Sequence, residues 1–320
     1  LAMGRCKGQQ LKEALIWRVL SRVRPSSVAE RSEHGLSAAD YASDNDLSAE
    51  MISLLRQGEV AELERTAAGR CRVCGDIIPQ RSRLAYFAHR AAIGKEGNSL
   101  MQMFFSRGFH NPLLEPHYHQ INDMRTIRKE LSESLALLQA LEEHEPAFGQ
   151  GWHVVDMCCG KSVTAALLSV RHPEVIVSAI DRLPPRMLPH FNRLEGCNVK
   201  YAQLDVLADS FTAKLQSLVQ QEQRPTALLG MHLCGFLSTC AIQCFTDISE
   251  IKAIALSPCC LPNQSDPRSP PELYLTRDGA EQYKSWAAYL EALLAQGAPR
   301  GKVTSRRVAD ILSPRDIVIC

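Results

Sequence analysis

The chain has 320 residues, of which 45% are hydrophobic and 22% charged, and its 36 lysines and arginines nearly balance its 35 acidic residues. This composition is typical of a globular protein and excludes a disordered tail, a collagen-like fibre and a membrane bundle. A near-zero net charge creates no global field toward nucleic acid or anionic lipid, so any binding of RNA must be local.

Signals for a membrane or for secretion are missing from the sequence. No apolar run approaches the roughly 20 residues that cross a bilayer, and the N-terminus lacks the order of a signal peptide. The 12 cysteines include the adjacent pairs Cys158-Cys159 and Cys259-Cys260, which suit a reducing compartment better than a disulfide framework. We therefore expect a cytoplasmic protein, with the nucleus as the alternative. Leu1 and the strand pattern that ends at Cys320 predict a fragment with a truncated C-terminus.

Residues 1–64 form a predicted helical region. Residues 35–58 within it contain two short helical patterns separated by a polar turn, and the second has Met51, Ile52, Leu54 and Leu55 on one face. This segment resembles the last repeat of an ankyrin array, so it is either a remnant of such an array or a plain helical hairpin. We expect the region to select a substrate or to bind a protein partner.

Residues 65–120 form a second predicted segment, which is basic at its start. Residues 65–90 carry six arginines against one aspartate, a local surplus that could contact RNA. Cys71 and Cys74 are spaced as half of a zinc site, because two thiolates three residues apart can face one tetrahedral ion. The sequence shows no clear second half, so a zinc site and an ordinary turn both remain open.

Residues 121–150 contain the pattern of one long amphipathic helix. Apolar side chains recur every three or four residues between Ile121 and Leu141, and Gly149-Gln150-Gly151 follows. We expect one helix over residues 121–145.

Residues 151–320 alternate short apolar strands with helices. The predicted strands are 153–157, 175–180, 198–204, 226–231 and 251–256, with two more in 302–320. Helices are predicted over 162–170 and 211–220. This alternation predicts an α/β fold with a Rossmann-like, doubly wound, mostly parallel seven-stranded sheet, preceded by a mainly helical N-terminal extension.

The ends of the first three strands carry the residues that we expect to bind a cofactor. In an open parallel sheet, ligands bind at the carboxyl ends of the strands. The first strand runs into a turn with an acidic residue, small residues and a helix start that offers free N–H groups. Asp181 ends the second strand, where it could accept hydrogen bonds from a ribose diol, and Asp205 follows the third, where it could meet an adenine amino group. The candidate cofactor residues are Asp156, Cys158, Cys159, Gly160, Asp181, Asp205 and His232.

The glycine content of the first turn narrows the choice of cofactor class. A dinucleotide usually needs Gly-x-Gly-x-x-Gly to admit its pyrophosphate, and this turn contains only Gly160. A nucleoside without phosphates matches better, which indicates S-adenosylmethionine. At this point the sequence resembles the Rossmann-like methyltransferases, with Asp156 and Gly160 in the first motif. The alternative is that these carboxylates only cap helices.

The next two strand ends extend the resemblance. His232-Leu233-Cys234-Gly235 and Pro258-Cys259-Cys260 resemble the His-x-Cys-Gly and Pro-Cys-Cys signatures of a group that includes tRNA 2'-O-methyltransferases and methyltransferase-like proteins of uncertain substrate. The proven tRNA members have a histidine after the cysteine pair and further zinc modules, whereas Leu261 stands here. The resemblance therefore implies a methyltransferase more firmly than it implies a tRNA substrate.

Four residues are candidates for catalysis: His232, Cys259, Cys260 and Lys161. A histidine with an ordinary pKa suits a general base, although His232 could equally shape the pocket. Lys161 could orient an anionic acceptor or deprotonate it. The clustered cysteines allow three interpretations: a nucleophile, as in pyrimidine methylation, a metal site, or small residues packed under the cofactor.

These observations lead to one hypothesis and two rivals. We expect a methyltransferase dependent on S-adenosylmethionine, with RNA as its acceptor. One rival is a catalytically degenerate scaffold that binds a partner. The other is a methyltransferase that acts on a protein or a small molecule and needs no basic path for RNA.

Overall fold

The computed structural model describes residues 82–114, 118–122, 124–188, 191, 198–298 and 301–320. The chain divides into two compact units, residues 1–95 with 123–128, and residues 96–122 with 129–320. The ankyrin-like segment and the Cys71–Cys74 pair lie outside the described residues. In the first unit, α5 (Arg83–Ala92) begins after Ser82, whose hydroxyl accepts the N–H of Ala85.

A seven-stranded sheet forms the centre of the second unit. Its order is β3-β2-β1-β4-β5-β7-β6. The first five strands are parallel, and β7 runs antiparallel to both β5 and β6. The strands are β1 (His153–Met157), β2 (Ile176–Asp181), β3 (Val199–Gln203), β4 (Thr226–Met231), β5 (Ile251–Ser257), β6 (Ser305–Arg307) and β7 (Ile317–Ile319). The predicted fold class is therefore confirmed.

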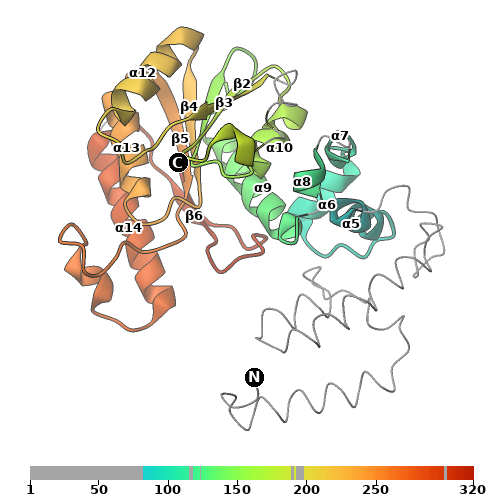
Figure 1. The fold of residues 1–320 in the computed structure, drawn as a ribbon. Coiled ribbons are helices and arrows are strands. Elements are labelled where there is room, and N and C mark those ends of the chain that lie inside the picture. The colour runs from blue at the N-terminus through green and yellow to red at the C-terminus, as the bar shows by residue number, and fades with distance from the viewer. Residues whose placement is uncertain (1–81, 115–117, 123, 189–190, 192–197, 299–300) are drawn as a thin grey trace, which may run out of the picture. The chain divides into compact units, whose positions relative to one another are not determined.

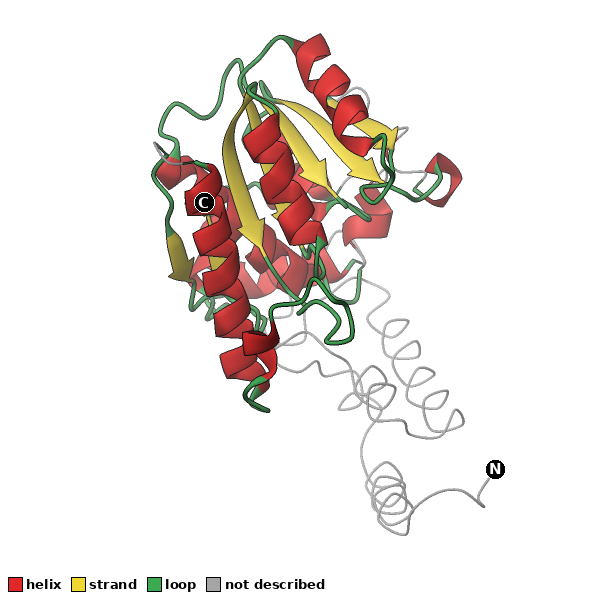
Figure 2. Cartoon of the chain, turned by 90° about the vertical axis from the view of Figure 1, so that its left-hand side faces the viewer, coloured by secondary structure: helices red, strands yellow, loops and turns green. Residues whose placement is uncertain are grey.

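Helices cover both faces of this sheet. Figure 1 shows α12 (Phe211–Glu222), α13 (Leu237–Asp247) and α14 (Gly279–Gly297) on one face, and α9 (Ile127–His144) and α10 (Val163–Arg171) on the other. Figure 2 shows the first of these layers in front of the strands. Trp286 and Leu290 of α14 are fully buried there with Ile254 of β5, which places one core between this layer and the sheet.

Short helices complete the second unit. They are α6 (Ser99–Ser106), α7 (His110–Leu113) and α8 (His119–Asn122), with the 3₁₀ turns η3 (Pro185–Met187) and η5 (Pro271–Tyr274). Asn98 caps α6 by accepting the N–H of Met101 at 3.0 Å. No helix in the described part of the chain is long and apolar enough to cross a membrane.

The predicted strands match the observed ones within about one residue at each end, and residues 302–320 supply β6 and β7 as expected. The helix predicted over residues 121–145 is instead interrupted between α8 and α9. The Asn122 side chain donates to the Leu113 carbonyl at 3.1 Å, and the N–H of Ile127 closes a turn onto Met124. An asparagine that binds backbone outside its own helix favours such a turn, although the apolar spacing continues through it.

Candidate active site

A cavity of about 230 Å³ lies at the carboxyl ends of β2 and β3. Three of the residues predicted to bind the cofactor line it together, namely Cys158, Asp181 and Asp205. The other lining residues are Arg182, Leu204, Val206, Leu207 and Leu237, so the walls are largely apolar. A hollow of about 470 Å³ at the opposite edge, beside the start of β4 and β5, contains none of the predicted residues.

The turn between β1 and α10 is fixed to the end of β2. The N–H of Gly160 donates to the Asp181 carboxylate at 2.9 Å, and the N–H of Leu183 donates to its other oxygen, also at 2.9 Å. Cys158, Gly160 and Ser162 all have positive φ, between 49° and 57°. Gly160 allows this conformation without strain, and a Cβ there would meet nothing within 4 Å. The turn therefore has an open side at Gly160.

Asp156 is buried in β1, where it holds this turn through Ser162, and it does not line the cavity. Its carboxylate is 2% exposed and accepts a hydrogen bond from the Ser162 hydroxyl. Burial raises the pKa of Asp156 from 3.8 to about 7, despite the opposing hydrogen bond from Ser162. Cys159 is half-buried in the same turn, and Lys161 is exposed there.

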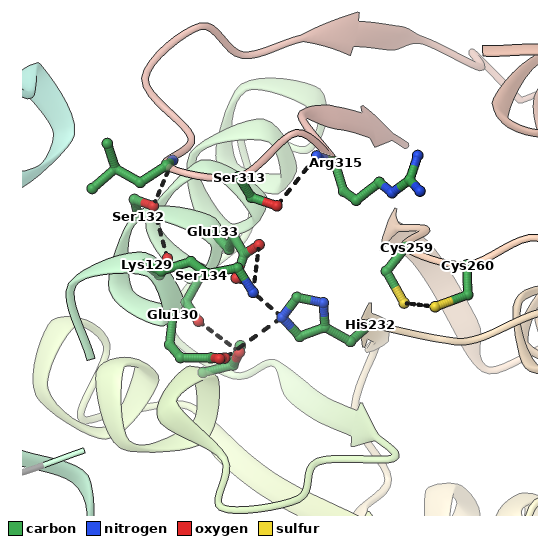
Figure 3. Close-up of polar contacts among 12 residues, drawn as sticks. Lys129, Glu130, Ser132, Glu133, Ser134, His232, Cys259, Cys260, Ser313 and Arg315 are labelled. Carbon is green, nitrogen blue, oxygen red and sulfur yellow. Dashed lines mark hydrogen bonds and ion pairs between the residues drawn. The ribbon is translucent and has the colours of Figure 1, made fainter. Parts of the chain in front are cut away.

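His232 follows β4 and meets two carboxylates from α9. Its Nε2 atom lies 3.0 Å from Glu133 and 3.5 Å from Glu130 (Figure 3). Hydrogen bonds to Cys259, Glu130 and Glu133 raise the pKa of His232 to about 11, although burial opposes them. Contact with two carboxylates favours the protonated imidazole. The role of His232 as a general base stays a prediction.

The two glutamates were not among the predicted site residues. Glu133 is only 1% exposed and Ser132 and Ser134 beside it are also buried, so a polar stretch of α9 lies inside the protein. The sequence signal that could have indicated these glutamates is the run of polar residues at positions 132–134 within the amphipathic pattern of α9. The sequence alone does not show that this part of α9 faces the end of β4.

Three cysteines, Cys234, Cys259 and Cys260, lie together beside His232. The Sγ atom of Cys234, which follows β4, lies 3.2 Å from that of Cys259 and 3.4 Å from that of Cys260. The Sγ atoms of Cys259 and Cys260 are 3.4 Å apart (Figure 3). Burial raises the pKa of the Cys259 thiol, but hydrogen bonds with His232, Cys234 and Cys260 outweigh burial and lower it. Cys158 and Cys159, by contrast, belong to the turn after β1, where burial raises the pKa of both thiols.

The predicted site residues thus form two neighbouring groups at the carboxyl edge of the sheet. Cys158, Asp181 and Asp205 surround the cavity, whereas His232, Cys259 and Cys260 gather beyond β4 with Glu130 and Glu133. All of these residues lie within residues 117–265, which match a family model described as a methyltransferase domain. This segment is therefore similar to methyltransferase domains. The predicted enzyme class, a methyltransferase dependent on S-adenosylmethionine, is thereby confirmed.

The chain also matches solved structures at low sequence identity. No curated protein matches the chain. A cyclopropane-fatty-acyl-phospholipid synthase-like protein from Lactobacillus casei is 14% identical, with 57% of this chain and 74% of that chain covered and a TM-score of 0.35. An O-methyltransferase family protein from Burkholderia thailandensis is 10% identical, with coverage of 98% and 94% and a TM-score of 0.35.

The plantazolicin methyltransferase BpumL, solved with a substrate analogue and SAH, is 12% identical. The match covers 74% of this chain and 96% of that chain, with a TM-score of 0.32. Similarities this low do not bear on the substrate of this methyltransferase domain.

Proposed function

We propose that the chain transfers the methyl group of S-adenosylmethionine to a ribose hydroxyl of RNA, such as the 2'-hydroxyl of a tRNA. The cavity lined by Asp181 and Asp205 is the observation that supports S-adenosylmethionine as the cofactor. Carboxylates accept hydrogen bonds from a ribose diol and an adenine amino group, and the apolar walls at Val206 and Leu237 suit a flat base. The residues present therefore fit the adenosyl part of this cofactor, which supplies an electrophilic methyl group on a sulfonium.

The acceptor side favours oxygen over an amino nitrogen. After β4 the chain continues as His232-Leu233-Cys234, without the Asp/Asn-Pro-Pro-[Tyr/Phe] tetrapeptide of amino-methylating enzymes. Resemblance of the His-x-Cys-Gly and Pro-Cys-Cys segments to the tRNA 2'-O-methyltransferase group supports a ribose hydroxyl. The basic residues 65–90 provide a local site for phosphates, and residues 1–64 are the proposed surface for a protein partner.

A hydroxyl acceptor must lose its proton as the bond from oxygen to methyl forms. His232 is engaged by two carboxylates and by Cys259, so it is better placed to orient Glu130 than to take up the proton itself. We assign proton uptake to Glu130, whose side chain is 23% exposed, and orientation to His232. Lys161, exposed in the turn before α10, would bind a phosphate of the acceptor.

Methyl transfer from labelled S-adenosylmethionine into a cell extract tests this proposal. The extract is then divided into RNA, protein and small-molecule fractions. We expect label in RNA that disappears with RNase and that falls with Asp181→Asn at a sub-saturating concentration of S-adenosylmethionine. Nucleoside analysis should find a 2'-O-methylated ribose. Asp209→Asn, at an exposed aspartate outside the cavity lining, is the matched control.

The other outcomes separate the rival functions. Label only in protein or in small molecules would overturn the RNA acceptor and leave the enzyme class intact. Binding of S-adenosylhomocysteine without transfer to any fraction would favour the degenerate scaffold.

A further inference from the structure

Three thiols from two separate loops meet at the carboxyl edge of the sheet. We call Cys234, Cys259 and Cys260 the thiol triad. Cys234 lies in the loop after β4, and the other two lie after β5. Their Sγ atoms form a nearly equilateral triangle with sides of 3.2, 3.4 and 3.4 Å. A convergence of three soft ligands, two of them far in sequence from the third, is the arrangement that a thiophilic metal ion requires.

The triangle is close to the size that a tetrahedral zinc ion needs. With a Zn–S distance near 2.3 Å, two sulfur ligands of one ion lie about 3.8 Å apart. The triad would therefore open by about half an ångström on binding, which rotation of the cysteine side chains can supply. Among the described residues, only one other group of possible ligands converges comparably, Glu130, Glu133 and His232, and those atoms are not thiols.

Backbone hydrogen bonds hold the two loops at this separation. The N–H of Gly235 donates to the Cys260 carbonyl at 3.1 Å, and the N–H of His232 donates to the Ser257 carbonyl at 3.2 Å. Gly235 has a φ of +53°, and a Cβ there would lie 3.2 Å from the Pro262 Cα atom. The close approach of the loops thus depends on this glycine, and it brings the triad together before any ion binds.

The surroundings of the triad compensate the charge of a thiolate site. Three thiolates around a divalent ion leave one net negative charge. The His232 imidazole, which contacts the Glu130 and Glu133 carboxylates, and the Arg315 guanidinium both lie beside the triad. Figure 3 shows His232 between the glutamates of α9 and the Cys259–Cys260 pair, with Arg315 extending toward the same pair. Cationic groups beside a thiolate site offset its negative charge.

We propose that the thiol triad binds one zinc ion. Cys234 and Cys260 are exposed and Cys259 is half-buried, so the ion has access from solvent. Three protein ligands leave the fourth tetrahedral position for water or another ligand, as in open rather than structural zinc sites. The proposal does not depend on which acceptor the methyltransferase uses.

The test uses the full chain with Cys71→Ser and Cys74→Ser as the background, which removes the other candidate thiols. The reduced, metal-free protein is titrated with Zn²⁺ against a chromophoric chelator. We expect one tight equivalent. Cys234→Ser, Cys259→Ser and Cys260→Ser should each weaken binding by more than about 100-fold, since even residues that only support ligands contribute about 10- to 100-fold. Cys240→Ser, at a half-buried cysteine of α13 outside the triad, should leave the affinity unchanged.

A second measurement covers the case in which a serine variant fails to fold. Co²⁺ added to the background protein should produce intense thiolate-to-metal charge-transfer absorption and the visible bands of a tetrahedral ion, which Zn²⁺ then abolishes. Absence of a tight Zn²⁺ equivalent in the background, octahedral cobalt bands without charge transfer, or unchanged affinity in folded Cys259→Ser would each overturn the proposal.

Discussion

At the scale of one residue, Asp181 connects the turn after β1 to the cavity at the ends of β2 and β3. Its carboxylate accepts the N–H groups of Gly160 and Leu183 and also lines the cavity. It therefore anchors the turn after β1 while presenting a hydrogen-bond acceptor to a ligand. An asparagine keeps one carbonyl oxygen but loses the charge and one of the two oxygens that accept these N–H groups, so it weakens both roles together.

Asp181→Asn should weaken binding of S-adenosylhomocysteine by about 10- to 100-fold, the effect of losing one hydrogen bond to a charged group. Calorimetric titration measures this affinity, and thermal denaturation of the same sample reports on the fold. Asp209→Asn, the exposed control, should bind as the parent does. An unchanged affinity in a folded Asp181→Asn protein would remove Asp181 from the cofactor site.

Asp156 gives the stability of the domain a pH dependence of predictable sign. Its pKa is about 7 in the folded chain, against 3.8 for the ordinary group, because of burial. Other groups that act on it are the Ser162 hydroxyl, the Ala165 N–H and the charge of Asp181. Below its unfolded pKa the side chain is neutral in both states. As pH rises toward 7, Asp156 is ionised in the unfolded chain but still protonated in the folded chain. The free energy of unfolding therefore falls.

Asp156→Asn mimics the neutral carboxyl group and should lose this pH dependence. Between pH 4 and pH 7 the free energy of unfolding of the parent should fall by about 3 kcal/mol relative to the variant. Urea denaturation at a series of pH values measures the difference. Parallel pH profiles for the two proteins would mean that Asp156 is not held neutral by burial.

Residues that follow strands were predictable, whereas residues brought by helices were not. Asp181 and Asp205 were expected at one edge because parallel strands end there together, and they do line one cavity. Glu130 and Glu133 come from α9, whose rotation against the sheet is set by packing. The environment of His232, and with it the protonation state, could not be read without those two carboxylates.

At the scale of elements, the start of α10 couples a helix cap to a buried carboxylate. The Ser162 hydroxyl accepts the N–H of Ala165 at 3.0 Å and donates to Asp156. Asp278 caps α14 in the simpler way, accepting the N–H of Ala280 at 2.8 Å from an exposed position. Ser162 therefore has one partner more than an ordinary cap, and that partner is buried.

Ser162→Ala should lower the free energy of unfolding by about 1–3 kcal/mol, because both the cap and a partner of Asp156 are lost. Asp278→Ala should cost about 1 kcal/mol or less, the usual value for a cap alone. Chemical denaturation of the two variants in parallel makes the comparison. Equal losses would show that the contact between Ser162 and Asp156 contributes nothing to stability.

The same scale shows why some elements were missed. The five parallel strands are mostly short apolar runs bounded by turn residues, so the limits of β1 to β5 were predicted within about one residue. The interruption between α8 and α9 depends on Asn122 reaching the Leu113 carbonyl, a tertiary contact. α14 has no counterpart among the predicted elements, although its buried Trp286, Leu290 and Leu294 recur at helical spacing.

At the scale of the whole molecule, the proposed function assigns cofactor binding and RNA binding to different parts of the chain. Residues 117–265 contain both groups of site residues. The basic residues 65–90 precede that segment, and most of them lie outside the described part of the chain. An enzyme built in this way should let RNA binding and cofactor binding be impaired separately.

Replacing Arg70, Arg72, Arg81 and Arg83 by alanine tests this separation. Each arginine that neutralises a phosphate releases counterions. Removing four should therefore make the negative slope of log affinity against log salt shallower by about 3 for a single strand. Filter binding of unfractionated RNA at several salt concentrations measures the slope, and binding of S-adenosylhomocysteine should be unchanged. Alanine at Lys200, Lys214, Lys252 and Lys284, four exposed lysines of the methyltransferase fold, is the charge-matched control. If both quadruple variants lower the slope equally, the basic segment is not the RNA site, and the acceptor must be recognised by the residues around the cavity.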